Sequence, residues 1–232
     1  MGRDEQIRDN LARVRETLTR AAAQAGRPTP TLIGVTKRAT DEEMIALIRL
    51  GVADVGENYP QALARRAEML DGAGLRPRMH LIGHLQTNKV RLVVGRAALI
   101  HSLDSERLAL CIERTAAQAG VIQPVLVEIN VGREPDKTGV LPEQALPLCR
   151  AVAALPHLRL RGLMTMAPPA DDPEDSRPYF RLVKGLFDEG RRAGLFGDEP
   201  VLSMGMSRTC AVAAEEGATM VRVGSALFSD DI

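Results

Sequence analysis

Residues 31–51 read TLIGVTKRATDEEMIALIRLG, and this stretch indicates the fold. The apolar run Thr31 to Thr36 predicts a buried strand, and Lys37 follows at the point where that strand leaves the core. Thr40-Asp41-Glu42-Glu43 is a capping box that predicts the start of a helix, and Gly51 is typical of its end. The stretch is therefore one strand–loop–helix unit with a lysine in the loop.

The same alternation continues along the chain. Strands are predicted at Thr31 to Thr36, Ala53 to Gly56, Met79 to Gly83, Ala98 to Ser102, Pro124 to Asn130, Leu158 to Met164, Val201 to Met204 and Met220 to Val223. Helices are predicted at about 3–25, from Thr40 to Gly51, and at Asp104 to Ala119, Glu143 to Ala154, Glu174 to Ala193 and Arg208 to Glu216. Eight strands alternating with helices predict an α/β protein, a (β/α)8 TIM barrel with an extra N-terminal helix. A doubly wound open sheet is the alternative. With no linker or repeat to divide the chain, residues 1–232 are expected to form one domain.

Composition excludes several classes of protein. Of the 232 residues, 45% are hydrophobic and 26% charged, and the net charge of zero argues against a nucleic-acid binder. The charged N-terminus is unlike a signal peptide, and no apolar run approaches the roughly 20 residues that span a bilayer. Three widely spaced cysteines predict neither disulfides nor a zinc site. The chain is therefore expected to be cytoplasmic, without membrane contact.

Candidate site residues lie where strands end. Lys37 is an amine nucleophile for a carbonyl, although alternation along the strand leaves open whether it points into the barrel or toward the helices. After the last two strands, Ser207, Gly224 and Ser225 combine glycine with hydroxyls, a composition suited to phosphate. An amine beside a phosphate cradle suggests pyridoxal 5'-phosphate (PLP). A Schiff-base aldolase that holds a substrate phosphate is the alternative.

Polar residues in other strands are more ambiguous. Arg222 interrupts an apolar strand and needs a partner, either a pyridine nitrogen or a carboxylate such as Glu57 or Glu128. His80 and His84 are spaced like a helical metal pair, but in a strand they lie about 13 Å apart and cannot chelate one ion. No metal site is predicted.

Several segments, taken together in their order and spacing, resemble the pyridoxal-phosphate homeostasis protein family, single-domain relatives of the alanine racemase barrel. They are Val35-Thr36-Lys37, Gly56-Glu57-Asn58-Tyr59, His80-Leu81-Ile82-Gly83, Leu85-Gln86-Thr87-Asn88-Lys89, Lys137-Thr138-Gly139, Arg161-Gly162-Leu163-Met164, Ser203-Met204-Gly205-Met206-Ser207 and Val221-Arg222-Val223-Gly224.

The resemblance implies a protein of intracellular vitamin B6 homeostasis that carries PLP as an aldimine on Lys37. It implies Arg222 at the ring nitrogen, Asn58 beside the ring, and Ser207, Gly224 and Ser225 at the phosphate. PLP-dependent apo-enzymes are the implied recipients, and a monomer or weak homodimer is expected. Three positions depart from the family pattern. His84 stands in place of a proline, Thr209 in place of an aspartate, and Ser229 in place of a glycine. These leave the details of hydrogen bonding around Ser207 open.

The sequence also argues against amino-acid turnover. Two-base racemisation needs a second acid or base, typically tyrosine, opposite the lysine. The chain contains only Tyr59 and Tyr179, and the nine residues after the last predicted strand leave no room for the β-domain that supplies this tyrosine in racemases. An arginine at the ring nitrogen disfavours its protonation and weakens the electron sink. A non-enzymatic carrier is therefore predicted, with a racemase-like PLP enzyme or a Schiff-base aldolase as alternatives.

Overall fold

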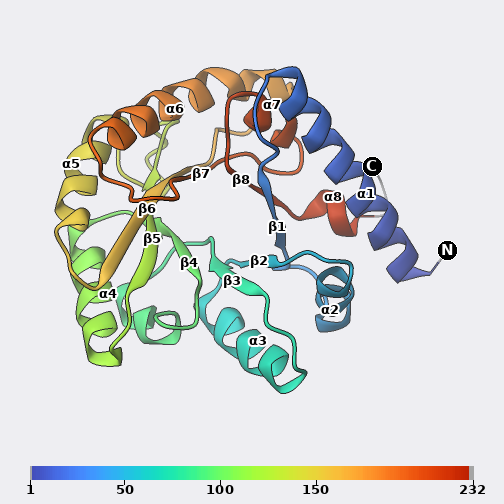
Figure 1. Ribbon diagram of the computed structural model, residues 1–232, viewed down its shortest axis with the longest axis horizontal. Helices are drawn as coiled ribbons and strands as arrows, with labels where there is room; N and C mark the ends of the chain where they lie inside the picture. Colours follow the sequence, from blue (N-terminus) through green and yellow to red (C-terminus); the bar gives the residue numbers. More distant parts are fainter. Residues whose placement is uncertain (1, 230–232) are drawn as a thin grey trace.

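A computed structural model describes residues 2–229 and shows a closed parallel barrel (Figure 1). Its strands are β1 Thr31–Val35, β2 Asp54–Glu57, β3 Arg78–Leu81, β4 Leu99–Leu103, β5 Gln123–Ile129, β6 Leu158–Thr165, β7 Val201–Ser203 and β8 Met220–Val223. Each strand pairs with the next, and β8 pairs with β1, so the sheet has no edge. The predicted (β/α)8 barrel is confirmed, and the open doubly wound sheet is wrong.

Helical segments surround the barrel. They are α1 Arg3–Gln24, α2 Asp41–Arg49, α3 Pro60–Gly72, the 3-10 helix η1 Thr87–Leu92, α4 Glu106–Ala119, α5 Pro142–Ala153, the 3-10 helix η2 Pro173–Ser176, α6 Arg177–Arg192, α7 Cys210–Glu215 and α8 Ser225–Phe228. The predicted extra N-terminal helix is α1, which packs on α7 and α8 (Figure 1). None of the described helices is long and apolar enough to cross a bilayer.

Local sequence accounts for where these elements begin. The predicted capping box before α2 is present, with the Thr40 side chain accepting a hydrogen bond from the Glu43 amide. One prediction needs correction, because the segment predicted to start at Glu174 begins with the 3-10 turn η2 before α6. The connection between β3 and β4, where no helix is predicted from the sequence, contains the 3-10 helix η1. 3-10 turns are frequent as short connectors, as in η1, and at the N-termini of α-helices, as in η2.

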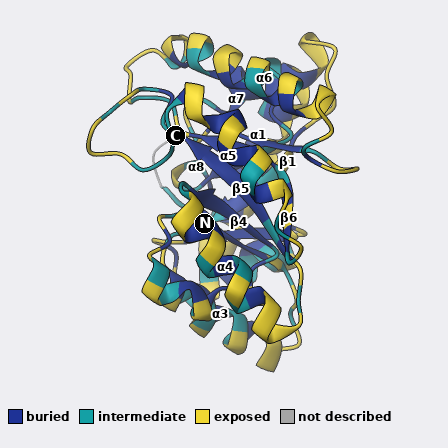
Figure 2. Cartoon of the chain, turned by 90° about the vertical axis from the view of Figure 1, so that its left-hand side faces the viewer, coloured by how far each residue is buried: buried dark blue, intermediate teal, exposed yellow. Residues whose placement is uncertain are grey.

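The core has two parts. Most buried apolar side chains lie between the strands and the helices, and Figure 2 shows the strands as buried while the helices expose their outer faces. A smaller apolar cluster of Leu99, Leu126, Met164 and Val201 fills the inside of the barrel. The carboxyl ends of the strands remain above this cluster, and there the cavity described next opens.

The close approach of the β6 backbone to the β7 backbone depends on a glycine. Gly162 in β6 has φ of +144°, and a Cβ added there would overlap the Val201 carbonyl oxygen of β7. The register between β5 and β6 shifts next to this position. A glycine here therefore lets β6 accommodate an extra residue while it stays paired with β7.

Candidate functional site

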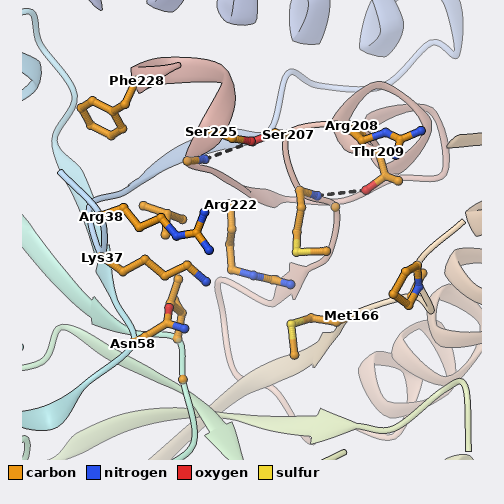
Figure 3. Close-up of a pocket in the computed structure, with 18 of the residues that line it drawn as sticks. Lys37, Arg38, Asn58, Met166, Ser207, Arg208, Thr209, Arg222, Ser225 and Phe228 are labelled. Atoms are coloured by element: carbon orange, nitrogen blue, oxygen red, sulfur yellow. Dashed lines mark hydrogen bonds between the residues drawn. The ribbon is translucent and has the colours of Figure 1, made fainter. Parts of the chain in front are cut away.

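A cavity of about 710 Å³ opens at the carboxyl ends of the strands (Figure 3). It is of the size that small-molecule and cofactor sites usually have. The predicted site residues Lys37, Asn58, Ser207, Arg222, Gly224 and Ser225 all line it. The structure thus brings together side chains from β1, β2, β7 and β8 and the loops that follow them.

The orientation of Lys37, which the sequence left open, follows from Gly34. A Cβ on Gly34 would lie 2.5 Å from a Leu47 methyl carbon of α2, so Gly34 faces the helices. Ile33 and Val35 therefore face the barrel interior, and Lys37 continues on their side. Its exposed side chain extends into the cavity in Figure 3, and it alone of the four lysines lines the cavity.

The loop that carries Lys37 is held by a buried arginine of α3. Arg66 donates from Nη1 to the Thr36 carbonyl oxygen at 2.8 Å and from Nη2 to the Ala39 carbonyl oxygen at 2.6 Å. Its Nη1 also forms an ion pair with the Glu57 carboxylate, which accepts a second hydrogen bond from the Thr36 hydroxyl. Arg66 therefore fixes the backbone on both sides of Lys37.

The two segments predicted to bind phosphate are linked by hydrogen bonds to the hydroxyl of Ser207. Ser207 Oγ accepts hydrogen bonds from the Gly224 amide, at 3.2 Å (Figure 3), and from the Ala226 amide, at 3.3 Å. Two backbone amides thus converge on one acceptor oxygen, as they do in anion sites. A Cβ on Gly224 would lie 3.2 Å from the Val35 carbonyl oxygen, so glycine lets the loop after β8 approach β1 closely beside the cavity.

Arg222 does not have the carboxylate partner that the sequence allowed. Its Nη1 donates to Ser203 Oγ at 2.6 Å and its Nη2 to the Thr165 carbonyl oxygen at 2.9 Å. Glu57 is instead paired with Arg66, and within residues 2–229 no carboxylate forms an ion pair with Arg222. Burial lowers the pKa of Arg222 to about 10, so the side chain is still a cation at neutral pH.

Glu128 is the site residue that sequence reasoning undervalued, since it entered only as a possible partner of Arg222. It lines the cavity, is 3% exposed, and accepts a hydrogen bond at Oε1 from the Thr138 hydroxyl. Its Oε2 is buried and has no protein partner. Burial raises the pKa of this carboxyl to about 7. The signal was present in the sequence, because Glu128 interrupts an apolar strand as Arg222 does.

The three departures from the family pattern are accommodated locally. Thr209 accepts a hydrogen bond at Oγ1 from the Met206 amide at 3.0 Å, which closes the turn before α7. Ser229 has φ of −81° and ψ of 149°, an extended conformation that needs no glycine. His84 is half-exposed at the rim, with Nδ1 3.6 Å from an Asp104 oxygen. None of them alters Lys37 or Arg222.

Of the other candidates, His84 lines the cavity, whereas His80 and the two tyrosines do not. His80 is buried in β3, while His84 is at the rim, and within residues 2–229 no cluster of three or more His, Cys, Asp or Glu side chains is arranged to hold a metal ion. Tyr59 is 64% exposed, and neither it nor Tyr179, both of which the structure describes, lines the cavity.

Comparisons with known proteins agree with this architecture. The family model for the alanine racemase N-terminal domain matches residues 5–231. A pyridoxal phosphate homeostasis protein of Aquifex aeolicus is 41% identical over 224 residues, which cover 96% of this chain and 97% of that protein. The protein of the same name from Escherichia coli is 35% identical, with 96% and 95% of the two chains covered. The solved structure of PipY from Synechococcus elongatus with PLP bound superimposes with a TM-score of 0.83 at 29% identity and covers 96% of this chain and all of that one.

Proposed function

The chain belongs to the pyridoxal phosphate homeostasis proteins, within the alanine racemase N-terminal domain family, and from this membership we propose that it binds PLP at the mouth of its barrel. The observation that carries the proposal is one cavity lined both by the Lys37 amine and by Ser207, Gly224 and Ser225, where the Gly224 amide donates to the Ser207 hydroxyl. In this proposal residues 1–232 act as one PLP-binding domain.

Lys37 is the proposed covalent attachment point. The aldehyde of PLP condenses with a primary amine and releases water, and Lys37 supplies the one lysine amine that lines the cavity. Arg66 supports this role, because it holds the backbone carbonyls of Thr36 and Ala39 on either side of the lysine.

The remaining site residues are proposed to hold the two ends of PLP. Ser207, Gly224 and Ser225 would bind the phosphate, since backbone amides and hydroxyls on two adjacent loops converge there. Arg222 would face the ring nitrogen from the barrel interior, and Asn58 would lie beside the ring. The backbone of Gly224, which lines the cavity without a side chain, and the cationic state of Arg222 both suit a phosphorylated pyridine ligand.

We propose further that the protein carries PLP without turning over amino acids. Neither tyrosine of the chain lines the cavity, so the acid or base that a two-base reaction needs opposite Lys37 is not supplied by tyrosine. A cationic Arg222 at the ring nitrogen would also disfavour protonation of that nitrogen. The role proposed is PLP homeostasis in the cytoplasm as a monomer or weak homodimer, with PLP passed to apo-enzymes and no contact with nucleic acid or membrane.

Borohydride reduction tests the attachment point. The protein loaded with PLP should be yellow, lose its visible band on reduction, and yield one pyridoxyl-modified peptide containing Lys37. Lys37→Ala should abolish the modification, whereas the control Lys137→Ala, which changes a lysine outside the cavity, should leave it intact. A pyridoxyl group on Lys89 or Lys137 in the wild type would refute the assignment.

A panel of L- and D-amino acids tests the carrier role. Racemisation, decarboxylation and transamination should all stay far below the usual enzymatic turnover of about 1 s⁻¹. In the same experiment, loaded protein should activate a PLP-dependent apo-enzyme, and Lys37→Ala should change the rate of that delivery. Turnover near 1 s⁻¹ that disappears in Lys37→Ala would overturn the carrier role and support a racemase-like enzyme.

A further inference from the structure

A chain of buried polar side chains runs through the inside of the barrel and ends at Arg222. Asp54 Oδ1 lies 2.9 Å from His80 Nε2, and His80 Nδ1 lies 3.0 Å from His101 Nε2. His101 Nδ1 lies 3.0 Å from Ser203 Oγ, which accepts the hydrogen bond from Arg222 at 2.6 Å. All five side chains belong to residues no more than 4% exposed, so water does not satisfy them.

The chain crosses the barrel rather than following its wall. Asp54, His80 and His101 stand on the neighbouring strands β2, β3 and β4, whereas Ser203 and Arg222 stand on β7 and β8. β5 and β6 lie between the two groups in the sheet. The contact between His101 and Ser203 therefore spans the interior below the cavity.

Its far end is anchored at the amino ends of the strands. Asp54 begins β2 and is paired in register with Arg78, the first residue of β3. Arg78 donates to the Asp54 carboxylate from Nε at 2.7 Å and from Nη2 at 2.5 Å. Hydrogen bonds from His80 and Arg78 hold the pKa of Asp54 at about 2, against its burial, so this end carries a negative charge.

Hydrogen-bond chemistry gives the chain a single direction. Arg222 can only donate, so Ser203 Oγ accepts from it, and the Ser203 hydroxyl hydrogen is left to donate to His101 Nδ1. His101 must then carry its proton on Nε2 and donate to His80 Nδ1. His80 in turn carries its proton on Nε2 and donates to the ionised Asp54. Every donor thus points from Arg222 toward Asp54.

The opposite direction leaves atoms unsatisfied. If His80 donated to His101, then His101 would donate to Ser203, and the Ser203 hydroxyl would lose its acceptor in a fully buried place. A neutral His80 would also turn a bare nitrogen toward the Asp54 carboxylate. Burial, together with the nearby His80 and Arg222, lowers the pKa of His101 well below its usual range, so a charged imidazole there is also excluded.

We infer that Ser203, His101, His80 and Asp54 are positioning residues for Arg222. The guanidinium has no carboxylate ion pair within residues 2–229, and its two described partners are Ser203 and the Thr165 carbonyl oxygen. Hydrogen bonds aligned in one direction place their acceptor ends toward the cation and their donor ends toward the anion, and they strengthen one another. This chain of hydrogen bonds therefore fixes both the position and the positive charge of the Arg222 guanidinium beneath the cavity.

The consequence rests on the proposed function, in which Arg222 faces the ring nitrogen of PLP. The electronic state of the bound ring then depends on residues that never touch it. Loss of Ser203 would leave the guanidinium free to turn toward Glu128, the buried carboxylate that shares the cavity. The ring nitrogen would lose its cationic neighbour, and the visible spectrum of bound PLP would report the change.

The hydrogen-bond chain is tested first without PLP. In a variant with His84→Gln and His157→Gln, which removes the two partly exposed histidines, nitrogen-15 NMR of the side chains should show two neutral imidazoles at pH 7. Both should be protonated at Nε2. A signal for an Nδ1-protonated or a doubly protonated ring would overturn the inference. This measurement also decides the case if variants at Ser203 do not fold.

The effect on PLP is tested with Ser203→Ala and a matched control. Ser102 is an equally buried serine beside His101, but its hydroxyl has no protein partner. Ser203→Ala should shift the pH midpoint of the bound PLP absorbance band and raise the Kd for PLP roughly tenfold. Ser102→Ala should change neither. Folded Ser203→Ala protein with the wild-type midpoint would overturn the positioning role.

Failure of the proposed function would look different. A wild-type protein that binds no PLP would overturn the function, and with it the effect on the ring. The histidine spectrum would still uphold or overturn the hydrogen-bond chain that holds Arg222.

Discussion

Replacing Glu128 with glutamine should stabilise the PLP-free protein, by an amount that grows as the pH rises. The native carboxyl has its pKa raised from 4.5 to about 7 by burial, so the native state binds this proton more tightly than the unfolded state does. The contribution of Glu128 to stability is therefore complete below pH 4.5 and is lost as the pH rises through about 7. The difference between these two pKa values corresponds to a loss of about 3 kcal/mol in the free energy of unfolding at pH 8.

Glutamine keeps the shape and the hydrogen bond from Thr138 but has no proton to lose. Urea unfolding of wild type and Glu128→Gln at pH 4, 5, 6, 7 and 8 should give free energies of unfolding that nearly coincide at pH 4 and differ by about 3 kcal/mol at pH 8. Glu68→Gln is the matched control, because the Glu68 side chain is 72% exposed and water solvates it in both states. A separation that is independent of pH, or equal in the control, would refute the reasoning.

Three further replacements probe the loop, the sheet and the cavity. Arg66→Met leaves a buried glutamate without its cation and should lower the free energy of unfolding by about 3–5 kcal/mol in urea, whereas Arg65→Met, at a 57% exposed side chain, should lower it by less than about 1 kcal/mol. Gly162→Ala should destabilise by at least about 2 kcal/mol in thermal unfolding, since its Cβ meets the β7 backbone, whereas Gly185→Ala in open space on α6 should be neutral or stabilising. Gly224→Leu should weaken PLP much more than pyridoxal in a binding titration, and equal losses would count against a phosphate site there.

The fold could be predicted from sequence because its signals are local. Runs such as Val125 to Val127, which is buried on both faces, and Leu32 to Val35, which is buried or half-buried, make each strand of a parallel barrel appear as a short apolar segment between polar loops. The 3-10 connection at 87–92 was harder to predict, because so short a segment carries little periodic pattern.

The positions of the site residues were predictable for a related reason. All parallel strands end at the same rim, so Lys37, Asn58 and Ser207 could be placed together from their position after strands alone. The direction of the Lys37 side chain could not be predicted, since it depends on the contact between Gly34 and Leu47 of α2. The partner of Arg222 could not either. Its partners Ser203 and Thr165 lie 19 and 57 residues away in sequence, and no local pattern connects them to it.

Closure of the barrel also has a consequence for biosynthesis. Thr31 to Gly34 of β1 lie beside Met220 to Val223 of β8, so the first and last strands of the sheet share one wall of the cavity. A ribosome delivers β1 early and β8 only near the end of translation, and domains fold as their parts emerge. A nascent chain that lacks β8 has Lys37 but neither Arg222 nor Gly224. If PLP binds at the proposed site, loading follows completion of the polypeptide, and a truncated product has the Lys37 amine without Arg222 and Gly224 beside it.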